Sequence, residues 1–177
     1  MKTFNKYNSL LILLLIFAQV SFSQTYNEVE TNEETITEND IELSKKIFGN
    51  FGIGTGVNPR NYQITGNTLY LTQIGEFNSA SIITETNASE INISQNGDRN
   101  NVDLTYVANT AIADLIQNGN NNRIRDFVRD RNADISLDLI QDGDGLLFIR
   151  NGANSLTKSL KFRQSEASPT LIIRSYY

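Results

Sequence analysis

The chain has 177 residues and a formal net charge of −5, and it contains no Cys, His or Trp. Without Cys it can form no disulfide, and without His and Cys it lacks the commonest general base, thiolate nucleophiles and the usual zinc ligands. An acidic chain with no clustered basic face is not typical of nucleic-acid-binding proteins. We therefore expect no enzymatic activity, no cofactor or metal site, no nucleic-acid partner and no small-molecule substrate.

Residues 1–23 have the order of a secretory signal peptide. Lys2 and Lys6 precede an apolar run over residues 10–20, and small residues follow it. The run of 11 residues is shorter than the roughly 20 that a membrane-spanning helix needs. We predict cleavage after Ser23 and a secreted mature chain that begins at Gln24.

Residues 24–67 differ in composition from the rest of the chain. The stretch to about Lys46 is polar and acidic, and residues 48–67 are rich in Gly and contain Pro59. A segment with so few large apolar side chains gains little by burial. We predict that residues 24–67 form a disordered secretion and linker segment.

From residue 68 onward, a Gln-x-Gly-x-x-Asn pattern recurs. Successive Gln residues are 22, 22, 24 and 23 positions apart, while Leu146 replaces the Asn of copy four and Glu166 the Gly of copy five. Repetition at a fixed period of about 20 to 50 residues marks one supersecondary unit stacked on itself. The repeated positions are Gln73, Gly75, Asn78, Gln95, Gly97, Asn100, Gln117, Gly119, Asn122, Gln141, Gly143 and Gln164.

On both sides of each Gly-x-x-Asn stretch, apolar residues occupy alternate positions, which places them on one face of a strand. Gly accepts positive φ and Asn tolerates it, so this stretch is the predicted bend. A second polar break closes each unit, near Asn87, Asn109, Asn132 and Asn154. We therefore predict that each repeat consists of a strand, a turn and a second strand. The predicted repeats are 69–90, 91–112, 113–136, 137–157 and 158–177.

A two-stranded unit is too thin to be stable alone, but stacked units bury their apolar faces and pair their backbones about 4.8 Å apart. Equivalent Gln and Asn side chains would then bond along the stack as amide ladders. The predicted fold is an all-β, cross-β, amyloid-forming β-solenoid of about five repeats over residues 68–177. We see no cap in the sequence, so we expect open ends that template further pairing.

The repeats resemble those of the curlin family, the subunits of curli, which are extracellular amyloid fibres of bacteria. The shared features are an export signal, an unpatterned segment and tandem repeats of about 22 residues with Gln-x-Gly-x-x-Asn. The family's second Gln position holds Ile83, Thr105 and Phe127 here, and only Ser89 fits its Ser position. These departures favour the minor, nucleating subunit over the bulk subunit.

The resemblance implies export through an outer-membrane pore with accessory proteins, and a cell-surface fibre for adhesion and biofilm matrix. It also implies self-association and a second curlin-like subunit as partner. The degenerate fifth copy resembles the terminal repeat of the minor subunit. On that basis Arg163 and Arg174 are the expected nucleation and anchoring residues.

Three other interpretations remain open. Acidic residues near the bends, among them Asp98, Asp142 and Asp144, would suit a closed calcium-binding β-roll, although they do not recur in register. A secreted β-solenoid adhesin that forms no fibre has the same sequence pattern. A β-helix enzyme would need paired carboxylates such as Asp126 and Asp130. We interpret these two instead as part of a solvated strand face, interleaved with basic residues at 123–131.

Overall fold

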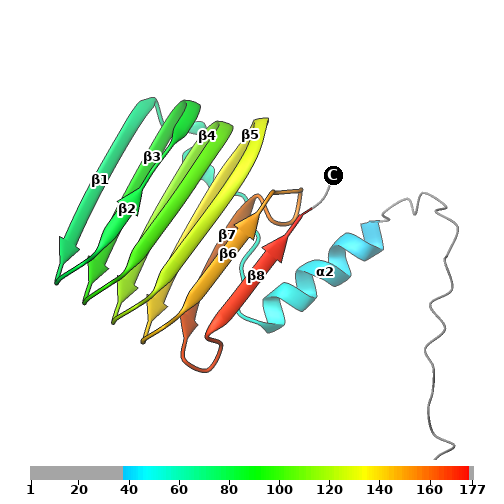
Figure 1. The fold of residues 1–177 in the computed structure, drawn as a ribbon. Helices are drawn as coiled ribbons and strands as arrows, with labels where there is room; N and C mark the ends of the chain where they lie inside the picture. The colour runs from blue at the N-terminus through cyan, green and yellow to red at the C-terminus, as the bar shows by residue number, and fades with distance from the viewer. Residues whose placement is uncertain (1–37, 176–177) are drawn as a thin grey trace, which may run out of the picture. The chain divides into compact units, whose positions relative to one another are not determined.

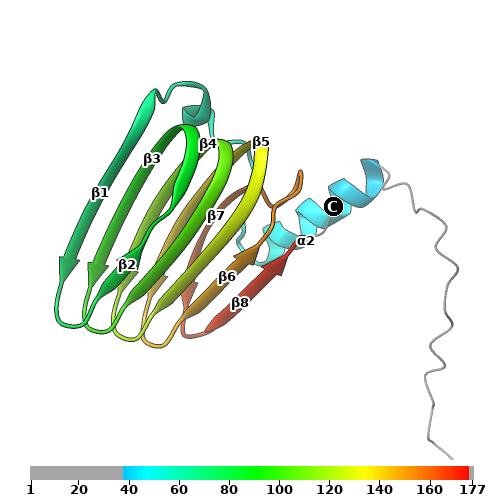
Figure 2. The same ribbon diagram turned by 45° about the horizontal axis from the view of Figure 1, so that its top comes forward.

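A computed structural model describes residues 38–175 as an almost entirely parallel β-structure (Figures 1 and 2). The predicted β-solenoid of about five turns is confirmed, whereas the predicted signal peptide and residues 24–37 lie outside the described residues. The elements are α2 (Glu38–Asn50), a 3-10 helix η1 (Pro59–Tyr62), β1 (Gly66–Ile74), β2 (Ser79–Ser81), β3 (Thr84–Asn96), β4 (Asn101–Asn118), β5 (Arg123–Asp142), β6 (Leu147–Asn151), β7 (Ser159–Ser165) and β8 (Thr170–Arg174).

The strands stack in parallel, and their register follows the repeat. Gln73 pairs with Gln95, Gln117 with Gln141, and Gln141 with Gln164. The register assigns residues 66–86 to coil one, 88–108 to coil two, 110–130 to coil three, 134–151 to coil four and 159–174 to coil five.

The second polar break does not interrupt most of the strands. β3, β4 and β5 run through it, so each of them contributes to two successive coils. Copy three is longer than its neighbours, and its extra residues form an irregularity at this corner, where Ala108 faces Asp130 but Thr110 faces Asp134. The insertion therefore leaves the bend and its ladders in register.

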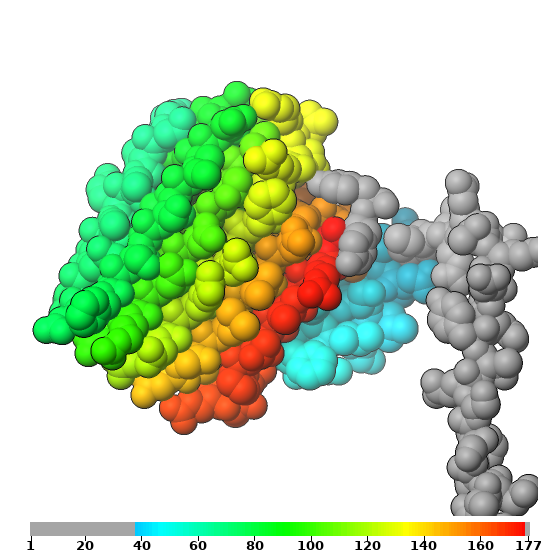
Figure 3. All heavy atoms as spheres, viewed as in Figure 1, coloured from blue at the N-terminus to red at the C-terminus, as the bar shows by residue number. Residues whose placement is uncertain are grey.

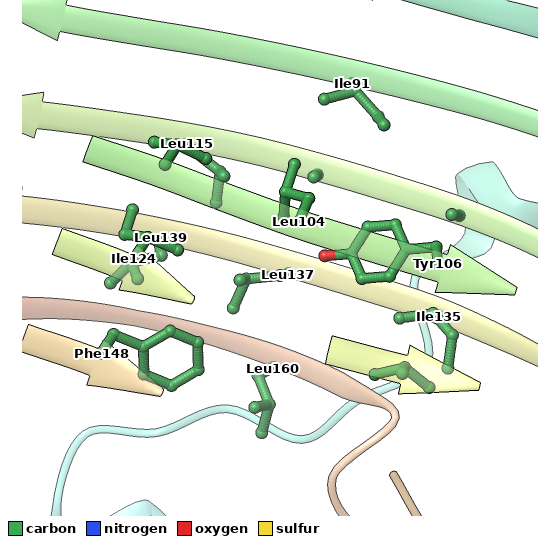
Figure 4. Packing of buried hydrophobic residues seen from close by; sticks show 14 of the residues in the cluster. Ile91, Leu104, Tyr106, Leu115, Ile124, Ile135, Leu137, Leu139, Phe148 and Leu160 are labelled. Atoms are coloured by element: carbon green, nitrogen blue, oxygen red, sulfur yellow. The ribbon is translucent and has the colours of Figure 1, made fainter. Parts of the chain in front are cut away.

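Side chains at the alternating apolar positions fill the interior of the stack (Figure 4). Ile91, Leu115 and Leu139 lie on successive coils and are almost inaccessible to solvent. Each such burial stabilises the fold by about 1.5–3 kcal/mol relative to exposure. In coil one the equivalent Leu69 and Leu71 remain 51% and 44% exposed, because no described strand lies on their outer side.

The glycines of the repeat are required for two reasons: their φ is positive, and the next coil leaves no room for a Cβ. Gly97 has φ +120°, and a Cβ on it would lie 2.2 Å from the carbonyl oxygen of Gly119 in the next coil. The other positive-φ position of the bend precedes the Asn and holds Phe77, Arg99 or Asn121. The bend therefore lies at the predicted Gly-x-x-Asn stretch, but the repeated Asn is not itself one of its positive-φ residues. Its side chain, not its backbone, makes it necessary, as the ladders below show.

The prediction of a disordered linker is wrong for residues 38–67. Glu38 and Asp40 lie in the first turn of α2, where acidic side chains stabilise the positive end of the helix dipole. Half-buried Ile41, Ser44 and Phe48 recur with helical spacing. Few apolar residues suffice here, because they pack on a surface that the solenoid supplies.

Residues after α2 cover coil five, so the prediction of two uncapped ends is also wrong. Ile53 is 6% exposed and packs in the core with Phe48 against it. The backbone of Gly54 forms an antiparallel bridge with Lys161 of β7, with hydrogen bonds of 2.8 and 2.9 Å. Further on, Asn61 donates to the hydroxyl of Thr110 and the carbonyl of Ile135. The chain is thus fixed along the corner of the stack before it enters coil one.

We predict that Gly97→Ala lowers the free energy of unfolding by about 3 kcal/mol or more, because it combines backbone strain with a close contact to the next coil. Chemical denaturation of the mature chain, followed by circular dichroism, measures the change. Gly56→Ala is the matched control, since nothing lies near its Cβ position. Equal effects of the two substitutions would contradict the close-stacking explanation.

Candidate assembly surface and amide ladders

The repeated glutamines form one continuous amide ladder. Each Nε2 donates to the Oε1 of the Gln in the next coil, and the four distances from Gln73 to Gln164 are 2.6, 2.8, 2.8 and 3.0 Å. The Nε2 of Gln95 also donates to the backbone carbonyl of Ser79, and that of Gln141 to Arg123. Because both N–H groups are used, these buried amides join coils along the stack and link the two strands across the bend.

The repeated asparagines form a second ladder, between side chains and backbone. Asn78 Oδ1 accepts from the backbone N–H of Asn100, and Asn100 Oδ1 accepts from that of Asn122. The Asn100 and Asn122 side chains donate to the carbonyls of Gly119 and Gly143, each at 2.7 Å. The ladder ends at coil four. There Asn122 Oδ1 accepts from the backbone N–H of Leu146, whose apolar side chain cannot continue the ladder.

Both ladders have a direction, so the two ends of the stack differ. In coil one, no described residue donates to the Oε1 of Gln73, and all of β1 is exposed. Large apolar side chains are exposed around it. They are Leu69, Tyr70, Leu71, Ile74, Phe77 and Ile83. This set, together with the outer edges of β1 and β2, is called the open edge below.

Coil five ends differently. The Nε2 of Gln164 lies within hydrogen-bond distance of the carbonyls of Leu147, Ser168 and Pro169, at 3.0 to 3.1 Å. In the space-filling view, α2 lies beside β8, and the two line a groove of about 720 Å³ (Figure 3). This end, with its covering residues 48–54, is called the capped end.

The structure places the two predicted anchoring residues on coil five. Arg163 is exposed and pairs with Asp142 of the preceding coil at 2.7 Å. Arg174 is also exposed, and both residues line the groove beside α2. Their positions leave both guanidinium groups accessible from outside the stack.

Asp126 is buried, so the interpretation of it as part of a solvated face is wrong. It receives two hydrogen bonds of 2.6 Å from Arg150, which lies one coil further along, and another from the hydroxyl of Tyr106. All three side chains are inaccessible to solvent. The alternating pattern of the sequence could have predicted this burial, because Asp126 lies between the inward-facing Ile124 and Val128. Arg150 occupies the same place in the next coil.

Burial and charge act together on this trio. Burial disfavours the charged form of Arg150, but attraction and hydrogen bonds from Asp126 outweigh it and raise the pKa of Arg150 above its ordinary value. For Tyr106, burial and then the Asp126 charge both raise the pKa of the phenol well above 10. The trio is therefore a neutral phenol beside a compensated ion pair, and it links coils two to four from inside.

The acidic residues that prompted the calcium interpretation are used in the bends. Asp98 Oδ1 accepts from the backbone of Glu76, and Asp144 Oδ1 accepts from that of Asn120. Among residues 38–175, no group of three or more acidic, His or Cys residues is arranged to hold a metal ion. Within that same range, no helix is long and apolar enough to cross a membrane.

The fold and its ladders define the class of protein: a parallel β-solenoid of strand–bend–strand coils joined by buried amides. No protein-family model matches the chain, and no curated protein or solved structure matches it either. Function must therefore be inferred from the ladders and the two ends of the stack.

We predict that Arg150→Met lowers the free energy of unfolding by about 3–5 kcal/mol, since it leaves the buried Asp126 carboxylate without a counter-charge. Chemical denaturation measures the change. Arg125→Met is the matched control, because Arg125 is half-exposed and its pairing with Asp103 is worth about 1 kcal/mol or less. A loss at Arg150 no larger than at Arg125 would show that the ion pair is dispensable.

The raised pKa of Tyr106 predicts a loss of stability at alkaline pH. The folded chain holds the phenol proton more tightly than the unfolded chain, in which a Tyr ionises near a pKa of about 10. The contribution is thus complete below that pH and is lost as the pH rises toward the folded pKa. Unfolding measured from pH 8 to 11 should lose stability less steeply in Tyr106→Phe than in wild type, and an unchanged slope would contradict the assignment. Tyr70→Phe, at an exposed position, should leave the slope as it is.

Proposed function

We propose that this protein is an extracellular structural protein, a curli-like functional amyloid subunit that nucleates or builds cell-surface fibres. The observation that carries the proposal is the open edge, where an unbroken Gln ladder and a parallel sheet end without a described partner. An exposed strand edge templates the pairing of further strands, and stacked Gln and Asn amides strengthen such pairing.

The distribution of apolar side chains supports templating at this edge. Leu69 and Leu71 occupy interior positions, yet about half of each side chain remains exposed. A strand added in register would bury them as Ile91 and Ile93 are buried in coil two. Addition would therefore extend the same core, with hydrophobic burial of about 25 cal/mol per Å² as the driving force.

Export and partners belong to the same proposal. The predicted signal peptide and the curlin-like repeats support secretion through an outer-membrane pore with accessory proteins, followed by assembly at the cell surface. A second curlin-like subunit is the proposed partner, and adhesion and biofilm matrix are the proposed roles. The exposed Arg163 and Arg174 would be available for nucleation or anchoring. No enzymatic step is part of this proposal.

The proposal is tested by diluting the mature chain from denaturant and recording the cross-β signal over time, with fibre diffraction at the plateau. We expect ordered fibres with a reflection near 4.7–4.8 Å. A soluble monomer with a single cooperative unfolding transition and no fibre would contradict the proposed function.

The ladders give a sharper expectation within the same assay. The double variant Gln95→Ala and Gln117→Ala should lengthen the lag roughly tenfold, because it removes buried hydrogen bonds from the middle of the stack. Asn92→Ala and Asp114→Ala form the matched control pair. These residues bond to each other across the same two coils but are only partly buried. An equal lag in the two double variants would count against the Gln ladder.

A further inference from the structure

The geometry of the stack specifies what a strand must carry to extend the open edge. The next Gln must donate to the Oε1 of Gln73, as each Gln donates to the following one inside the stack. Its Gly position must have no Cβ. Inside the stack, a Cβ on the repeated Gly would lie 2.2 Å from the carbonyl oxygen of the next Gly, and a Cβ on the added strand would meet the Gly75 carbonyl oxygen in the same way. Its Asn must offer Oδ1 to the backbone of Asn78, as Asn78 offers its own to Asn100.

Coil five of a second copy does not meet these requirements. Glu166 stands at the Gly position, and it is not among the residues with positive φ, so its bend differs from the other four. Pro169 stands at the Asn position and has no side-chain acceptor. The amide of Gln164 is already engaged with carbonyls of its own chain. Only the Gln of the motif is present, and it is not free to donate.

The cap adds a backbone obstacle. The N–H and carbonyl of Lys161 on the outer side of β7 are bonded to Gly54. Ile53 and Phe48 pack against the core at this end. A strand that pairs with β7 would have to displace residues 48–54 and expose their apolar side chains.

We propose that coil five is autoinhibited: its cap and altered bend slow its addition to the open edge of another copy, so that the open edge favours a terminal coil with an uncapped, unbroken Gln-x-Gly-x-x-Asn motif. Glu166, Pro169 and the cap at Ile53 and Gly54 are the specificity devices that disfavour head-to-tail addition of this chain to itself. The stack is one-ended: coil one accepts an incoming coil directly, whereas coil five of this chain adds to another copy only slowly, after residues 48–54 have moved aside. This inference rests on the proposed function and adds how the assembly is regulated.

The test measures elongation on preformed fibre seeds of the wild-type chain. The surrogate partner is the same chain with Glu166→Gly and Pro169→Asn, which together restore the motif in coil five. We expect this variant to add at least about tenfold faster than wild-type monomer, since it supplies the missing hydrogen bonds and removes the Cβ contact. Ala167→Gly, a change in the same loop that restores nothing, should add at the wild-type rate.

Two further variants keep the test decisive if the restored coil misfolds. Ile53→Asp should release the cap and speed addition several-fold, whereas Phe51→Asp should not, because Phe51 is 76% exposed. On the receiving side, seeds with Gln73→Ala should slow addition of the restored variant, and seeds with Thr72→Ala should not.

The outcomes separate the two proposals. Wild-type monomer that adds as fast as both the restored and the cap-released variants would overturn the one-ended stack and leave the proposed function intact. Edge-to-edge pairing of two copies through coil one would also overturn it, and would appear as wild-type dimers blocked by Gln73→Ala. Failure of every variant to form a cross-β assembly would instead remove the proposed function itself.

Discussion

The close vertical stacking of the bends is the constraint on which the rest of this protein depends. A Cβ at Gly75, Gly97 or Gly119 would lie 2.2 Å from the carbonyl of the next glycine, so these coils can be superposed only if the position has no side chain. That spacing in turn brings the Gln amides within 3.0 Å of one another. Register, amide ladders and the filled interior follow from it, because a shift of one residue would reverse every side chain in the sheet.

The buried trio shows how the stack tolerates polar groups inside. Asp126 and Arg150 occupy equivalent places in adjacent coils, which puts a carboxylate and a guanidinium in direct contact. A single buried charge would cost several kcal/mol, but this pair compensates itself, and Tyr106 satisfies a further acceptor site of the carboxylate. Such a pair contributes little net stability, although it fixes which coil follows which.

The two ends of the stack give it a direction. Identical internal coils could grow from either side, but the ladder begins at Gln73, whose Oε1 accepts from no described residue, and ends with an engaged donor at Gln164. Natural solenoids cover their ends because exposed edges recruit further strands. Here one end is covered by residues of the same chain, and the other is left without a cap from the described residues. That asymmetry is the physical basis of the proposed templating role.

The sequence by itself determined the repeat, its period, the strand–bend–strand unit and the inward apolar positions, because all of these are local patterns repeated in register. It also located the Gln and Asn ladders, since stacking equivalent residues is enough to align them. Only the tertiary structure decided that Phe48 and Ile53 cap coil five and that Asp126 is paired inside the stack. Contacts of this kind join segments far apart in the chain, such as Gly54 and Lys161, and no local periodicity encodes them.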